Sequence, residues 1–149
     1  MRRAALVLLA ALVPAPAPAL TCIAQDAALF YTIAAGSDAR FVAIHGAFRG
    51  DPVTGQASRP FRLEGKALTA DGFTRAFSAP VTFEPGCIAE FCGPNNPGTG
   101  SVLAFVEVVP GGYRLTAQPC GTSVIWGPTA RNLARVVACH RGEACEPGS

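Results

Sequence analysis

Six cysteines constrain this chain more than any other feature, because all of them lie downstream of an N-terminal segment that resembles an export signal and has none. An even number of thiols in a short exported chain is typical of a disulfide framework rather than of metal or redox chemistry. The sequence therefore predicts three disulfides and a periplasmic or extracellular location. The cysteines are Cys22, Cys87, Cys92, Cys120, Cys139 and Cys145.

The export signal is predicted from three zones that follow one another. Arg2 and Arg3 supply positive charge, and residues 4–13 form an uncharged apolar stretch too short to span a bilayer. An Ala-Pro repeat then offers a cleavage site after Ala19. We therefore expect a signal peptide at 1–19, with a soluble mature chain behind it.

A lipoprotein is the alternative interpretation, with Cys22 as its acylated first residue. The three residues before Cys22, Ala-Leu-Thr, match the usual approach to an acylated cysteine poorly. No later apolar run reaches membrane-spanning length. The sequence therefore predicts no membrane anchor after signal cleavage.

Residues 20–149 are enough for one domain with a hydrophobic core. The chain has 12 basic and 10 acidic side chains, and Arg2 and Arg3 leave with the signal, so the mature domain is close to neutral. A nucleic-acid binder normally carries a basic excess, so nucleic acid is disfavoured as a partner. Abundant Arg, Ala, Gly and Pro suggest a bacterial source with a GC-rich genome.

Alternating apolar and polar residues predict about five strands joined by short turns. Asp71-Gly72 and Pro110-Gly111-Gly112 mark two hairpins. A helix capped by Asp26 precedes the strands, and another begins near Pro128 and ends at Gly142. The expected strands are 40–49, 60–70, 73–83, 101–109 and 113–118.

Strands in meander-like order leave long edges exposed unless the sheet closes on itself. We therefore expect a mainly β fold: a small five-stranded antiparallel OB-like barrel with a short N-terminal helix and a C-terminal helix. Alternation puts Phe73 on the same face as Phe77, and a bend is expected at Gly46. The last helix should cover one open end through Leu133, Val136 and Val137. The predicted core comprises Phe61, Leu63, Phe77, Val81 and Val106.

The order of several segments resembles the OB-fold of netrin-like domains and of the tissue inhibitors of metalloproteinases. The resemblance covers about residues 22–140 and rests on cysteine placement and strand order, not on a diagnostic motif. The segments are Cys22, the strand 41–48, Phe91-Cys92-Gly93 before a glycine-rich loop, the strand 102–106, the run 113–120 that ends in Cys120, and Trp126-Gly127-Pro128 at the start of a helix.

The chain departs from the metalloproteinase inhibitors at its start. Their mature chain begins with Cys-x-Cys, and the amine and carbonyl of that first cysteine chelate the zinc of the protease. Here Leu20 and Thr21 precede Cys22, and Ala24 stands where the second cysteine would be. The inhibitory mechanism of that family therefore transfers to no residue of this chain.

Six cysteines allow fifteen pairings, and proximity favours two of the bonds, Cys87 with Cys92 and Cys139 with Cys145. That leaves Cys22 with Cys120, which agrees with the resemblance, where an N-terminal cysteine is tied to the end of the fifth strand. Cys22 with Cys92 is the main rival. A metal site from Cys87, Cys92, Cys139, His140 and Cys145 is disfavoured because the spacings are not those of zinc knuckles. We expect no metal and no cofactor.

Few residues are candidates for catalysis. His45 lies on the face of its strand opposite Val42 and Ile44, and His140 closes the apolar stripe of the last helix, so both read as partly buried structural residues. Ser101 does not occupy a nucleophile elbow. Glu84 and Glu90 flank Cys87 as loop carboxylates.

The sequence therefore predicts a non-catalytic binding or interaction module with an unknown protein or small-molecule partner, present as a monomer. A protease inhibitor is one alternative, and a small hydrolase that uses His45 or His140 is another. Polar residues of the strands are candidates for a binding face, although solvation alone also explains them. These residues are Arg62, Glu64, Lys66, Arg114 and Thr116.

Overall fold

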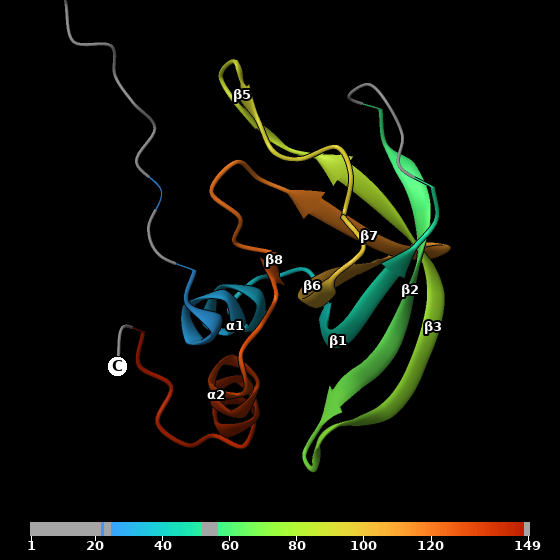
Figure 1. The fold of residues 1–149 in the computed structure, drawn as a ribbon. Coiled ribbons are helices and arrows are strands. Elements are labelled where there is room, and N and C mark those ends of the chain that lie inside the picture. Colours follow the sequence, from blue (N-terminus) through green and yellow to red (C-terminus); the bar gives the residue numbers. More distant parts are fainter. Residues whose placement is uncertain (1–21, 23–24, 52–56, 148–149) are drawn as a thin grey trace, which may run out of the picture.

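The computed structural model describes residues 22, 25–51 and 57–147. The predicted signal peptide at 1–19 and its cleavage site lie outside the described residues. The described chain is mainly β (Figure 1). Its helices are α1 (Ala27–Ala35) and α2 (Ala130–His140), and its strands are β1 (Phe41–Arg49), β2 (Arg59–Thr69), β3 (Gly72–Pro85), β4 (Cys87–Ile88), β5 (Phe91–Cys92), β6 (Ser101–Val109), β7 (Gly112–Ala117) and β8 (Val124–Trp126).

Five strands form a closed ring in the order β1-β2-β3-β7-β6, because β6 pairs back with β1. One edge of β6 pairs with β1, and its other edge pairs first with β8 and then with β7. The five long strands therefore correspond to the five that the sequence predicts. The short strands β4 and β5 form a separate hairpin.

The expectation of an all-antiparallel sheet is wrong, because β3 and β7 pair in parallel, from Val81↔Tyr113 to Pro85↔Ala117. The direction of β7 follows from its partners. β6 runs antiparallel to β1, and β7 runs antiparallel to β6, so β7 points the same way as β1 and β3. Closing the ring between β3 and β7 therefore requires a parallel pair.

The inside of the ring holds a core of buried apolar residues. Phe83 is buried in this core and meets the rings of Phe48 and Phe61 edge-on, with centroids 5.9 and 6.0 Å away. Phe77 is only half-buried and packs against Tyr113. The other four predicted core residues are buried: Phe61, Leu63, Val81 and Val106.

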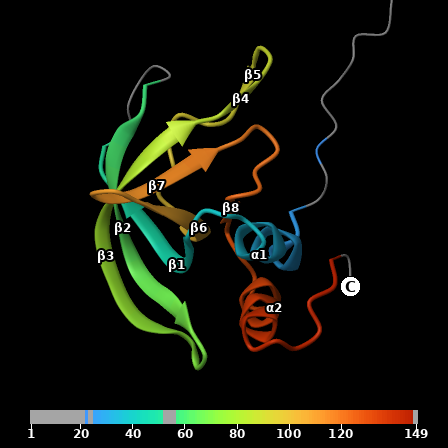
Figure 2. The same ribbon diagram turned by 180° about the vertical axis from the view of Figure 1, so that it is seen from behind.

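Both helices pack outside the ring, against the wall of β1, β6 and β8 (Figures 1 and 2). The expectation that α2 covers an open end through Leu133 is therefore wrong. The central strand β6 is apolar on both faces, so its outer face needs a cover. Phe30 of α1 and Val136 of α2 are fully buried in that layer, with Leu133 partly buried beside them.

Phe73 faces the helices and not the interior that Phe77 faces, so the alternation drawn from the sequence fails at this point. The register shifts between Ala67 and Leu68: Ala67 pairs with Arg75, and Leu68 pairs with Phe73. Thr74 is the extra residue of this β-bulge. A bulge moves every residue beyond it to the other face of the strand.

Gly46 and Gly65 are paired across β1 and β2 where these strands come very close together. A Cβ atom built on Gly46 would lie 2.1 Å from the backbone oxygen of Glu64, and one built on Gly65 would lie 2.2 Å from the backbone oxygen of His45. The bend expected at Gly46 is thus a close approach of two backbones that only glycine permits.

All six cysteines are in disulfides, Cys22–Cys120, Cys87–Cys92 and Cys139–Cys145. This is the pairing that the sequence predicts, and it excludes the rival bond from Cys22 to Cys92. It also removes the cysteines from any metal site. Three disulfides fit an oxidising compartment.

Candidate functional site

The β4–β5 hairpin projects from the ring at the end far from α2 (Figures 1 and 2). Ile88 pairs with Phe91 across it, and the Cys87–Cys92 disulfide closes its base. Ile88 is 47% exposed and Phe91 is 45% exposed, although both are large apolar side chains. The hairpin therefore presents a small apolar surface to solvent on a short, cross-linked support. We call it the apolar hairpin, residues 87–92.

Backbone contacts fix the apolar hairpin to the ring. The Gly86 N–H donates to the Ala117 carbonyl at 2.8 Å, and the Gly93 N–H donates to the Gly86 carbonyl at 2.8 Å. A Cβ atom on Gly93 would lie 1.9 Å from the Ala117 oxygen, so glycine is required for this approach. At the tip, Ala89 has a φ of 53°, the left-handed conformation that tight hairpin turns use.

A cleft of about 230 Å³ lies on the other side of the molecule, between α1, the end of α2 and strands β1 to β3. Its walls are mostly apolar, with Phe41, Leu68 and Phe105 as the large residues. Three polar side chains also line it, Tyr31, Arg75 and His140. They come from α1, β3 and α2, so the cleft exists only where the helices meet the ring.

Tyr31 and His140 form a pair at the cleft, 109 positions apart in the sequence. The Tyr31 hydroxyl lies 3.0 Å from His140 Nδ1, and the two rings meet edge-on with centroids 6.1 Å apart. Burial raises the pKa of the Tyr31 phenol above its usual value of 10.0. Tyr31 is therefore a neutral hydrogen-bonding group at physiological pH.

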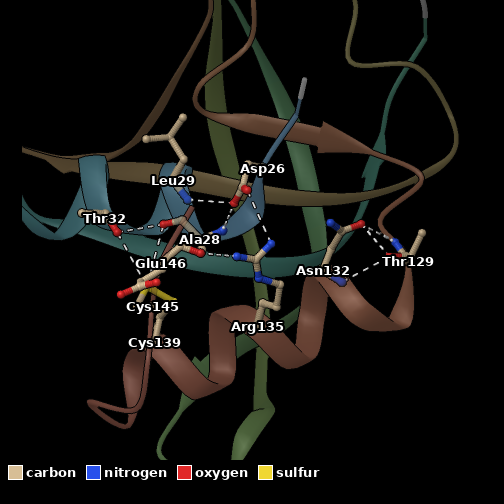
Figure 3. Close-up of polar contacts among 10 residues, drawn as sticks. All are labelled: Asp26, Ala28, Leu29, Thr32, Thr129, Asn132, Arg135, Cys139, Cys145 and Glu146. Carbon is tan, nitrogen blue, oxygen red and sulfur yellow. Dashed lines mark hydrogen bonds and ion pairs between the residues drawn. A yellow bond between two sulfur atoms is a disulfide. The ribbon is translucent and has the colours of Figure 1, made fainter. Parts of the chain in front are cut away.

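The helix pair that carries this wall is held together by polar contacts (Figure 3). Asp26 accepts hydrogen bonds from the N–H groups of Ala28 and Leu29, which caps α1, and forms an ion pair with Arg135 of α2 at 3.4 Å. Arg135 also donates to the Glu146 carbonyl. These contacts tie α1, α2 and the C-terminal turn into one unit.

The two histidines of the alternative hydrolase interpretation, His45 and His140, lie in different places. The His45 Nε2 atom is 3.1 Å from the Ser101 Oγ atom, and its ring meets Phe73 edge-on. Within the described chain, no carboxylate hydrogen-bonds to His45, and His45 does not line the cleft. His140 lines the cleft, but its partner is the Tyr31 hydroxyl. Neither histidine therefore has the base, nucleophile and orienting acid together.

The two candidate carboxylates are also separate. Glu84 lies on β3, where it pairs with Thr116 of β7 and contributes to the field at Arg114. Glu90 is exposed in the turn of the apolar hairpin. Within the described residues, no hydrogen bond joins them, so they do not form an acid and base pair.

Three of the five polar strand residues, Arg62, Glu64 and Arg114, contact neighbours outside the predicted set. Glu64 pairs with Arg49 at 3.3 Å, and Arg62 donates to Ser78. Arg114 donates two hydrogen bonds to one oxygen of Glu107, at 2.8 and 3.0 Å, and this bond raises the pKa of the guanidinium. These contacts are those of a solvated sheet surface. The other two residues of the predicted set are Lys66 and Thr116. Within the described residues, no hydrogen bond or ion pair joins the five residues into one site.

Within the described ranges, no three His, Cys, Asp or Glu side chains cluster as a metal site needs. Neither described helix is long and apolar enough to cross a membrane. No family model, no curated protein and no solved structure matches the chain.

Sequence patterns assigned no role at these two sites to Tyr31, Arg75, Ile88 or Phe91. The exposure of Ile88 and Phe91 was predictable, because a disulfide loop of six residues is too short to bury its own apolar side chains. No sequence pattern indicates Tyr31 and Arg75, because their neighbours in the cleft are distant in the sequence.

Proposed function

We propose that this protein is an exported, non-catalytic interaction module that binds a protein partner through the apolar hairpin. One observation carries the proposal. The described chain has three exposed large hydrophobic side chains, and two of them, Ile88 and Phe91, lie side by side on this one projecting element. Exposed apolar side chains gathered on one element mark interaction sites in soluble proteins.

The construction of the hairpin supports this role. Its disulfide and the backbone hydrogen bonds from Gly86 to Ala117 and from Gly93 to Gly86 keep the two apolar side chains in one arrangement before a partner arrives. Binding by such an element costs less conformational entropy than binding by a free loop. The only charged residue of the apolar hairpin is Glu90, so we expect the partner to offer an apolar pocket with a neutral or basic rim.

We further propose that the closed ring is an OB-like barrel, as the resemblance to netrin-like domains implies. Its support is the strand order β1-β2-β3-β7-β6 with β6 returning to β1, together with the Cys22–Cys120 bond. Small barrels of this kind place their contacts on loops and on one face. The three disulfides support export to the periplasm or the extracellular space.

The test is affinity capture of the mature protein's partner in the native exported fraction. The wild-type chain should retain a defined partner, and a chain with Ile88→Ser and Phe91→Ser should lose it. Ile33→Ser is the matched control, because Ile33 is the third exposed large hydrophobic residue, 47% exposed, and lies on α1. Equal melting temperatures would show that all the variants are folded.

Two outcomes would contradict the proposal. Retention of the same partner by the double variant would remove the apolar hairpin from the interface. Loss of the partner in the Ile33 variant alone would move the interface to α1.

A small hydrolase is the second candidate, because the contact between His45 and Ser101 is the first element of a nucleophilic site. Within the described residues, no carboxylate hydrogen-bonds to His45 and orients its ring. Turnover of ester substrates that is lost in Ser101→Ala and His45→Ala would establish the hydrolase. A protease inhibitor is one form that the proposed interaction could take, and it predicts inhibition by the wild type that the Ile88 and Phe91 variant lacks.

A further inference from the structure

The cleft lies where the pairing of β1 with β2 stops. The last pair is Ile44↔Ala67, although β1 continues back to Phe41 in pairing with β6. The β2-facing edge of residues 41–43 therefore opens toward Leu68 and Arg75, and α1 and His140 close the other side. The cleft is thus a break in the ring wall, walled by the helices.

Among the described residues that line the cleft, Arg75 carries the only fixed charge. Arg75 lines the cleft, and its side chain makes no hydrogen bond or ion pair within the described chain. No acidic residue is among the described residues that line the cleft. A guanidinium in this setting favours an anion, and its planar fork suits a carboxylate.

The other lining residues indicate what the uncharged part of the ligand is like. Phe41, Leu68 and Phe105 give the cleft an apolar floor, and Tyr31 adds a neutral hydroxyl that does not repel an anion. The volume of about 230 Å³ is below the range of about 300 to 1,000 Å³ that is typical for drug-sized ligands. Space and chemistry together suit one carboxylate on a body the size of a single apolar side chain.

We propose that this cleft binds a carboxylate joined to a small apolar body, with the guanidinium of Arg75 on the carboxylate and the apolar body against Phe41 and Phe105. Two sources offer this chemistry, a free organic acid and the C-terminal residue of a peptide chain. The proposal concerns a different surface from the apolar hairpin and does not depend on it.

The experiment is an NMR titration of the oxidised mature protein with phenylacetate and with its neutral analogue phenylacetamide. We expect saturable shifts at cleft residues with phenylacetate below about 10 mM, and binding at least about tenfold weaker with the amide. Arg75→Gln should weaken phenylacetate binding by a similar factor. Arg62→Gln is the matched control, since Arg62 is also an exposed arginine but lies on the outer face of β2, away from the cleft.

A second series separates the two sources. N-acetylphenylalanine and a short peptide that ends in phenylalanine carry the same terminal group on longer chains. Tighter binding of the peptide would assign the cleft to chain termini, and binding of phenylacetate alone would assign it to free acids.

Three results would overturn the proposal. They are equal affinity for the acid and the amide, unchanged affinity in Arg75→Gln, and no saturable shift at cleft residues with any of these probes. Because the hairpin variant Ile88→Ser with Phe91→Ser leaves the cleft intact, it should bind phenylacetate normally. Failure of the carboxylate proposal would therefore leave the proposed interaction function untouched.

Discussion

Replacement of Gly46 by alanine should destabilise the protein by about 2 to 4 kcal/mol. The new Cβ would lie 2.1 Å from the Glu64 oxygen, whereas real Cβ atoms essentially never come closer than 3.0 Å to such a neighbour. The two strands must separate by roughly 1 Å, which strains the wall by about 1 to 3 kcal/mol and weakens one or two hydrogen bonds of about 1 kcal/mol each. A gain of about 0.4 to 1 kcal/mol from the less flexible unfolded chain offsets part of this cost.

Urea denaturation of the oxidised mature protein measures this loss directly. With a slope of about 2 kcal/mol per molar urea, in the middle of the usual range, the midpoint should fall by about 1 to 2 M. Gly112→Ala is the control, because no atom lies within 4 Å of its Cβ position and its φ is not positive. It should change the free energy of unfolding by less than about 0.5 kcal/mol. A Gly46 variant as stable as this control would refute the close approach.

Three further results are expected. Cys22→Ser with Cys120→Ser should cost about 4 to 5 kcal/mol in the chain-entropy model, since that bond closes a separation of 98 residues, and a thermal melt little changed from the wild type would contradict it. Asp26→Ala should lower the free energy of unfolding by about 1 to 2 kcal/mol. Asp26→Ser keeps the cap of α1 and loses only the ion pair with Arg135, so it should lower it less. Equal losses of stability for the two variants in denaturation curves would show that the cap contributes nothing. Because burial raises the pKa of Tyr31 above 10.0, its proton stays on the folded chain when the unfolded chain has lost it. The contribution of Tyr31 to stability should therefore be constant below pH 10 and fall as the pH rises from there through the raised pKa. Urea curves of the wild type and Tyr31→Phe across this range should diverge, and parallel curves would argue against burial of the phenol.

Local patterns were sufficient to predict the individual elements of this fold. Alternation located the five long strands, and a hairpin joins β2 to β3 where Asp71-Gly72 predicts one. Its turn residues are Ala70 and Asp71, however, and Gly72, at a φ of 101°, is already the first residue of β3. Asp26 caps α1 as expected. Each of these features depends on residues that are neighbours in the sequence.

Features that depend on distant partners could not be predicted in this way. The bulge at Thr74 reverses the face of Phe73, and no residue type nearby signals it. The parallel pairing of β3 with β7 follows from the pairing of β6 with β1. The alternation of apolar and polar residues does not indicate which strand β6 pairs with. The continuous apolar run of β6 is typical of a strand that is covered on both faces. This run indicates that an element such as α2 packs on the outer face of the ring.

The candidate sites show the same division. The disulfide loop 87–92 was predicted from spacing, and its two exposed apolar side chains follow from its length. The cleft joins Tyr31, Arg75 and His140 from three elements, so only the folded chain reveals it. Sequence spacing indicates His45 and His140 as candidates, but it does not indicate their partners, Ser101 and Tyr31.

Closure of the ring has a consequence for the order in which the chain must fold. β1 and β3 are the two ends of an open three-stranded sheet until β6 pairs with β1 and β7 pairs with β3. Until then both outer strands have unsatisfied backbone edges, and such edges recruit other chains. The contacts that remove them join residues far apart in the sequence, which makes this step slow relative to hairpin formation. A chain that ends before residue 101 would therefore keep two unpaired strand edges, and we expect it to aggregate.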